Sequence, residues 1–106
     1  MKNRFSDQSL ERIVEQGMIY MCACPAQVGA AMQQLRSLYD YQMRCITEPT
    51  NDPEVHRAIA AGTLQAHQVL EATLLRVMEL EHWDPVTLTM PDGLRKRQID
   101  EAQGQP

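Results

Sequence analysis

Aromatic side chains are scarce in this sequence: among its 106 residues there are one Phe, one Trp and three Tyr. The core therefore has to be filled by aliphatic side chains and by the seven Met, whose flexible thioethers fit irregular gaps. A chain of this length folds as one domain and buries roughly two-thirds of the surface that its unfolded form exposes. The composition favours a small all-α domain with a modest core.

The sequence also lacks the usual features of secreted, membrane and nucleic-acid-binding proteins. Its three cysteines are an odd number, and no apolar segment follows Met1-Lys2-Asn3-Arg4-Phe5, which disfavours a secretory leader and a disulfide framework. No apolar run approaches the roughly 20 residues of a membrane-spanning helix. The net charge of −4 gives no general attraction to phosphate backbones or anionic membranes. We expect a soluble, cytoplasmic protein that binds neither nucleic acid nor membranes.

The longest predicted element is a helix over residues 52–83. Asp52 is a suitable cap, Pro53 fits the first helical position, and Asp84-Pro85 ends the pattern. One apolar row follows helical spacing through Val55, Ile59, Gly62, Ala66, Val69, Leu70, Thr73, Val77 and Leu80. A second row runs beside it through Ala60, Leu64, His67, Leu74 and Met78. Two apolar rows predict two packing neighbours for this helix.

An extra helical segment is predicted at the N-terminus. Ser6 or Asp7 is suited to cap it, and with Ser6 as the cap, Phe5 and Leu10 occupy the positions of a hydrophobic staple. Apolar residues then recur on one face, at Leu10, Ile13, Val14, Gly17, Met18 and Met21. This segment is long enough to cover part of the helix over 52–83.

A second helix is predicted to begin near Pro25 and to run to about Ile46. Proline either kinks a continuous helix here or opens a new one, and its preference for the first helical turn favours the break. The turn residues 47–51 then connect this helix to the helix over 52–83 as an antiparallel hairpin. The pairing places Met32 near His67.

Residues 86–106 form a predicted C-terminal arm and tail, separate from a helical domain over residues 1–85. Val86-Thr87-Leu88-Thr89-Met90 alternates threonine with apolar side chains, and the turn signal Pro91-Asp92-Gly93 follows. Such a strand-like arm has no partner strand in this chain. We expect it to lie extended along the helices or to pair with the arm of a second copy.

The candidate metal ligands are Cys22, Cys24 and His67. A thiol at a helix N-terminus feels the positive end of the dipole, and His67 has Glu71 one turn later, a pair that shares metals in some helical bundles. Cys45 lies about 30 Å further along, so one chain cannot gather all three cysteines. The alternatives are small buried cysteines and a His67 hydrogen-bonded to Glu71 or to a partner chain. We expect no cofactor.

The candidate partner-binding residues are Trp83, Leu88 and Met90. Trp83 follows Glu79 and Glu81, and an indole beside an acidic rim is suited to anchor a protein partner. The alternative is that the indole plugs the end of its own helix.

The predicted function is that of a small, non-enzymatic, homodimeric accessory or regulatory protein that binds other proteins. The dimer follows from area, because the hairpin partner covers one apolar row of the helix over 52–83 and the short N-terminal segment covers part of the other. The alternative is a thiol- or metal-responsive sensor that uses Cys22 and Cys24 together with His67 of a second subunit. No phosphate-binding loop, nucleophile elbow or zinc-protease motif supports an enzyme.

Overall fold

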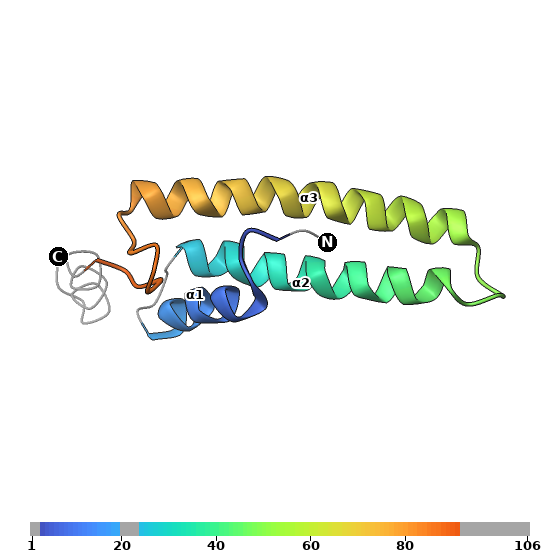
Figure 1. Cartoon of the computed structure of the whole chain (residues 1–106), viewed down its shortest axis with the longest axis horizontal. Helices are drawn as coiled ribbons and strands as arrows, with labels where there is room; N and C mark the ends of the chain where they lie inside the picture. The colour runs from blue at the N-terminus through green and yellow to red at the C-terminus, as the bar shows by residue number, and fades with distance from the viewer. Residues whose placement is uncertain (1–2, 20–23, 92–106) are drawn as a thin grey trace, which may run out of the picture.

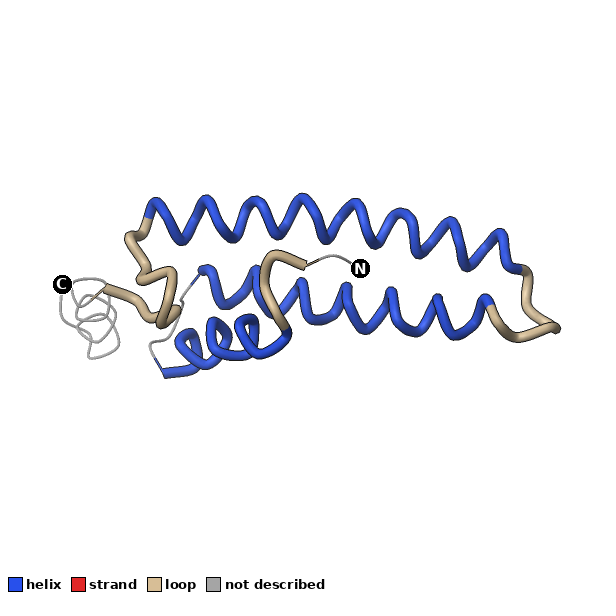
Figure 2. The backbone as a smooth tube through the Cα atoms, in the orientation of Figure 1, coloured by secondary structure: helices blue, strands red, loops and turns tan. Residues whose placement is uncertain are grey.

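The computed structural model describes residues 3–19 and 24–91, and its regular elements there are three α-helices. They are α1 (Asp7–Ile19), α2 (Cys24–Ile46) and α3 (Pro53–Leu80). Figure 1 shows α2 lying between α1 and α3. No strand occurs in the described ranges, and loops connect the helices (Figure 2). The predicted all-α class is therefore confirmed.

The helices α2 and α3 form the predicted antiparallel hairpin (Figure 1). In the connecting turn, the side-chain amide of Asn51 donates to the carbonyl of Cys45 over 3.2 Å. Asp52 then caps α3, since its Oδ1 accepts the amide hydrogen of Glu54 over 3.0 Å, and Pro53 occupies the first helical turn. The predicted start of this helix is confirmed.

The end of α3 lies at Leu80, three residues before the predicted end. His82 adopts a left-handed backbone conformation with φ of 59°. Its amide donates to the carbonyl of Glu79, and the amide of Trp83 donates to the carbonyl of Met78 over 3.0 Å. This is a Schellman cap, which normally has glycine at the left-handed position. Because histidine stands there, the sequence carries no visible stop signal at Leu80, and the prediction placed the end of the helix just before Asp84-Pro85.

The predicted break at Pro25 is confirmed, because α1 and α2 are separate helices and Pro25 lies in the first turn of α2. Ser6 caps α1, with its Oγ accepting the amide hydrogen of Ser9 over 3.0 Å. A Cβ added at Gly29 would lie 3.5 Å from the side chain of Val14, an ordinary van der Waals contact, so α1 packs against α2 at this point and an alanine would also fit. The predicted candidate Cys22 lies outside the described residues.

The hydrophobic core lies where α1, α2 and the C-terminal half of α3 meet. Its buried members are Phe5, Leu10, Ile13, Ala26, Met32, Leu74, Met78, Trp83 and Met90. Phe5 and Leu10 belong to the same cluster, as expected of a hydrophobic staple. Every part of the described chain contributes to this core, except the half of the hairpin next to the turn that connects α2 to α3.

The segment after α3 folds into a closed turn, which differs from the extended arm that its alternating pattern predicts. The amide of Asp84 donates to the carbonyl of Thr89 over 3.0 Å, and the amide of Leu88 donates back to the carbonyl of Asp84 over 2.9 Å. The Asp84 carboxylate also accepts the amide hydrogens of Val86 and Thr87. These local bonds replace strand pairing, so the described part of residues 86–106 packs onto the helical domain.

Candidate functional site

A buried polar cluster joins the N-terminal segment, which we define as residues 3–7, to α2 and α3. Arg36 of α2 is 7% exposed, and His67 and Glu71 of α3 are 0% and 4% exposed. Charged side chains are rarely buried to this extent unless they are paired. The stability of the cluster therefore depends on how many of its polar groups are hydrogen-bonded or ion-paired to one another.

Arg36 supplies most of the donors in this cluster. Its Nε donates to Nε2 of His67 over 2.9 Å, and its terminal nitrogens donate to the carboxylate of Asp7 over 2.6 Å and to the carbonyl of Phe5 over 2.5 Å. A terminal nitrogen also lies 3.6 Å from the carboxylate of Glu71. One guanidinium thus contacts the N-terminal segment and α3 at the same time.

Glu71 completes the attachment of the N-terminal segment. Its Oε2 accepts the backbone amide hydrogens of Arg4 over 2.8 Å and of Phe5 over 3.2 Å. Without this acceptor the buried amide of Phe5 would be unpaired, at a cost of about 1–3 kcal/mol. Glu71 therefore fixes the path of the backbone ahead of α1.

The tautomer of His67 follows from its contact with Arg36. Because Arg36 Nε is a donor, Nε2 of His67 must be the acceptor, and the ring proton resides on Nδ1. Nδ1 is buried and has no hydrogen-bond partner in the described part of the chain. Burial, together with the positive charge of Arg36, lowers the pKa of His67, and the negative charge of Glu71 opposes this shift. His67 is held neutral.

The predicted partner of His67 was Glu71 or a second chain, whereas the structure pairs the ring with Arg36. The predicted hairpin pairing placed Met32 opposite His67, and Arg36 lies one helical turn beyond Met32 on the same side of α2. The signal in the sequence for the partner of His67 is therefore one arginine, Arg36, on the side of α2 that faces the core.

The predicted metal ligands are not brought together in the part of the chain that the structure describes. Cys24 is exposed in the first turn of α2, and Arg36, which contacts His67, lies about 18 Å further along that helix. No group of three or more His, Cys, Asp or Glu side chains in residues 3–19 and 24–91 is placed to hold a metal ion. The ligand set that includes Cys22 and a second subunit stays a prediction.

The predicted partner-binding residues have contacts within the chain. Trp83 and Met90 are buried in the core, and Leu88 packs against it. The indole Nε1 of Trp83 donates to the Glu81 carboxylate over 3.1 Å, and the amide of Met90 donates to Gln16 over 3.3 Å. These contacts make all three residues part of the folded domain.

An apolar groove runs between α2 and α3. It has a volume of about 570 Å³ and is lined by Ala31, Gln34, Leu35, Ala66, Val69 and Leu70. Helical spacing extends the two rows to Leu38 on α2 and to Val55 and Ile59 on α3, and all three are exposed. We call Ala31, Leu35, Leu38, Val55, Ile59, Ala66 and Val69 the apolar face.

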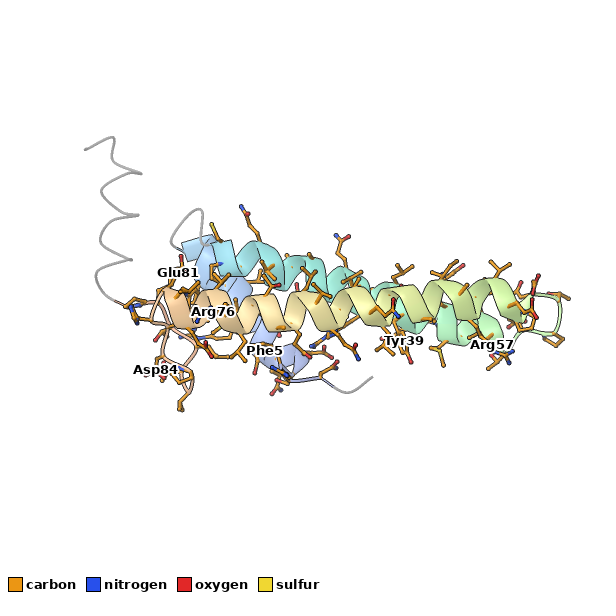
Figure 3. The ribbon with its side chains drawn as sticks, turned by 90° about the horizontal axis from the view of Figure 1, so that it is seen from above. Phe5, Tyr39, Arg57, Arg76, Glu81 and Asp84 are labelled. Carbon is orange, nitrogen blue, oxygen red and sulfur yellow. The ribbon has the colours of Figure 1, made fainter. Side chains whose placement is uncertain are left out.

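The half of the hairpin next to the connecting turn is covered by fewer helices than the other half. Asp7, the first residue of α1, contacts Arg36, which lies midway along α2, and α1 runs from there along the first half of α2 (Figure 1). Figure 3 shows Phe5 beside the covered half of α3, with Tyr39 and Arg57 toward the turn. Beyond Arg36 the described residues place no third helix on the hairpin. Tyr41 and Met43 are accordingly exposed there.

Comparison with known proteins gives no relative: no family model matches the chain, and neither a curated protein nor a solved structure is significantly similar to it. Among the described helices, none combines the length and the apolar character that crossing a membrane requires. Any functional assignment therefore rests on the surface and the cluster described above.

Proposed function

We propose that this protein is a non-enzymatic, homodimeric accessory protein, in which the apolar face of α2 and α3 binds a second copy. The observation that carries the proposal is the exposed aliphatic row of a hairpin that α1 covers along half its length. Val55, Ile59 and Val69 are 51%, 39% and 65% exposed, although their spacing is that of a packed helix face. Contiguous apolar surface of this kind marks interaction sites on soluble proteins.

The size of the face sets how strong the dimer can be. On α3 the face runs from Val55 to Val69, about 21 Å along the helix, and two neighbouring helices are roughly 20 Å wide. The face therefore offers about 400 Å² per copy, roughly half of what one partner contributes to an interface of standard size, so we expect a dimer that dissociates readily on dilution. Two copies would bring four long helices together around one apolar layer.

The charge pattern also supports a second copy as the partner. Residues 24–39 contain one charged side chain, Arg36, and residues 58–75 contain one, Glu71, and both are buried in the polar cluster. A twofold contact brings the same surface against itself, so any charge in it would face a like charge. The uncharged apolar face is free of that penalty.

The proposal is tested by two matched lysine substitutions and light-scattering measurement of the mass. Val69→Lys places a charge on the apolar face, at its most exposed residue on α3, and should convert the dimer into a folded monomer. Val86→Lys alters an equally aliphatic side chain that is 88% exposed in the turn after α3 and should leave the dimer intact. A dimer that survives Val69→Lys, or dissociates equally in both variants, would contradict the assigned face.

A further inference from the structure

The N-terminal segment is held by hydrogen bonds that all converge beside His67. Glu71 accepts the amide hydrogens of Arg4 and Phe5, and Arg36 donates to the carbonyl of Phe5 and to Asp7. Arg36 is oriented in turn by its bond to the ring of His67. Arg36 thus supplies two of the four hydrogen bonds that hold residues 3–7, and its bond to His67 is one of the contacts that orient its guanidinium.

The contact between Arg36 and His67 exists in one protonation state of the ring. A second proton on His67 would occupy Nε2, the atom that accepts the hydrogen bond from Arg36. The protonated ring would then present an N–H group to another N–H group, and two positive charges would meet at 0% exposure of the histidine. Both effects disfavour the arrangement seen in the structure.

The other charged groups around the ring do not remove this conflict. Glu71, on the same helix, attracts a protonated ring, but its Oε2 already accepts two backbone amides and lies 3.6 Å from Arg36. Asp7, from α1, contacts Arg36, but its side chain is 89% exposed and its charge is screened by solvent. Arg36, from α2, is the charge in direct contact with the ring. The lowered pKa of His67 agrees with this ranking.

We propose that protonation of His67 releases residues 3–7 from α2 and α3, so that the N-terminal segment opens in response to acid. The device is independent of the proposed dimer, because the apolar face lies in different helical rows from Arg36, His67 and Glu71. In the open form Arg36 is able to move away from the ring and reach solvent, and the ring can then accept its second proton.

The direction and size of the response follow from proton linkage. The closed form binds the proton more weakly than the open form, in which the ring is away from Arg36 and its pKa rises toward the ordinary histidine value of 6.5. Opening therefore becomes more favourable as the pH falls below 6.5 and is independent of pH above it. For a single proton, the opening constant rises by up to about tenfold between pH 7.5 and pH 5.5.

Amide hydrogen exchange of the full chain, read by mass spectrometry over peptides that cover residues 3–10, tests the proposal. After correction for intrinsic exchange rates, wild-type protection of this segment should fall by up to about tenfold between pH 7.5 and pH 5.5. His67→Gln keeps an acceptor for Arg36 without a titrating ring, so protection should stay constant. Glu71 and Asp7 remain in this variant, and any response of the carboxylates would survive in it.

The control is His56→Gln, which alters a histidine that contacts Gln42 in the far half of the hairpin. In this variant the protection of residues 3–10 should fall with decreasing pH as it does in the wild type. An unchanged wild-type segment, an equal response in His67→Gln, or loss of protection in α3 at the same pH as in residues 3–10 would each overturn the proposal. If His67→Gln does not fold, proton NMR of the wild-type imidazoles decides, because a His67 that titrates at or above pH 6.5 contradicts it.

Discussion

Arg36 and His67 share a 2.9 Å hydrogen bond between α2 and α3, in which a permanently charged guanidinium donates to a neutral imidazole that is fully buried. The same guanidinium holds Phe5 and lies beside Glu71. This bond therefore connects the long hairpin to the segment that precedes α1. Its members stand far apart in the sequence, and the fold brings them together.

Replacing Arg36 with Met tests whether this cluster stabilises the fold. The variant would leave Glu71 without its buried countercharge and the Phe5 carbonyl without its donor, and we expect a loss of roughly 3–5 kcal/mol in the free energy of unfolding. Urea unfolding followed by circular dichroism measures it. The matched control, Arg44→Met, alters an exposed arginine near the end of the same helix and should change stability by less than about 0.5 kcal/mol. Equal stability of the two variants would show that the cluster contributes nothing.

His82 offers a stabilising substitution, because a non-glycine residue with φ of 59° adopts a conformation that disfavours any Cβ. His82→Gly should raise the free energy of unfolding by roughly 0.5–1 kcal/mol while preserving the Schellman cap. His82→Ala removes the same imidazole but retains the Cβ, so it should bring no such gain. If alanine stabilises as much as glycine, the strain lies in the side chain and the assignment of the cap is contradicted.

Met90 lies in the core, 2% exposed, although it follows the last helix by ten residues. Met90→Ala should therefore destabilise the protein by about 2–5 kcal/mol, because it opens a cavity under α1. Val86→Ala, four residues earlier in the same turn but 88% exposed, should change stability by less than about 0.5 kcal/mol. A Met90→Ala variant as stable as wild type would leave Met90 available to a partner.

Much of the fold could be predicted from local chemistry. Asp52 and Pro53 predict the start of α3, and Pro25 predicts the start of α2. These signals are local, because a capping oxygen and a proline that lacks an amide hydrogen act within the first helical turn. The end of α3 could not be predicted, since His82 occupies a position that usually has glycine. The turn that begins at Asp84 could not be predicted either, because the alternation of threonine with apolar residues in the segment 86–90 is typical of a strand.

The polar cluster could be predicted less well than the helices. His67 was recognisable as a polar residue in an apolar row, but its partner depends on the axial alignment of α2 against α3. A shift of one helical turn exchanges Met32 for Arg36, and sequence spacing does not resolve such a shift. The hydrogen bonds from the amides of Arg4 and Phe5 to Glu71 are harder still to predict, because every residue except proline has a backbone amide hydrogen, whatever its side chain.

The two described cysteines should differ in reactivity. Cys24 is exposed, whereas Cys45 is half-buried near the end of α2. In a Cys22→Ser background, a mild alkylating reagent at neutral pH should label Cys24 faster than Cys45, as peptide mass spectrometry would show. Equal rates, or labelling after unfolding alone, would contradict the exposure of Cys24.

The same native protein also addresses the metal-sensor alternative. Purified without chelators and weighed intact under native conditions, a protein that works through its apolar face should have twice the mass of the polypeptide, with no added mass from a bound metal ion. Bound zinc or iron that is lost in a Cys22→Ser/Cys24→Ser variant would favour the sensor instead.

Sedimentation equilibrium of the unaltered chain tests the central claim most directly, because it measures mass independently of shape. At micromolar concentrations, the apolar face of α2 and α3 predicts a dimer with twice the chain mass of 12.1 kDa. On dilution this dimer should dissociate to the monomer. A fully helical protein that sediments at 12.1 kDa throughout the concentration series would contradict the dimer.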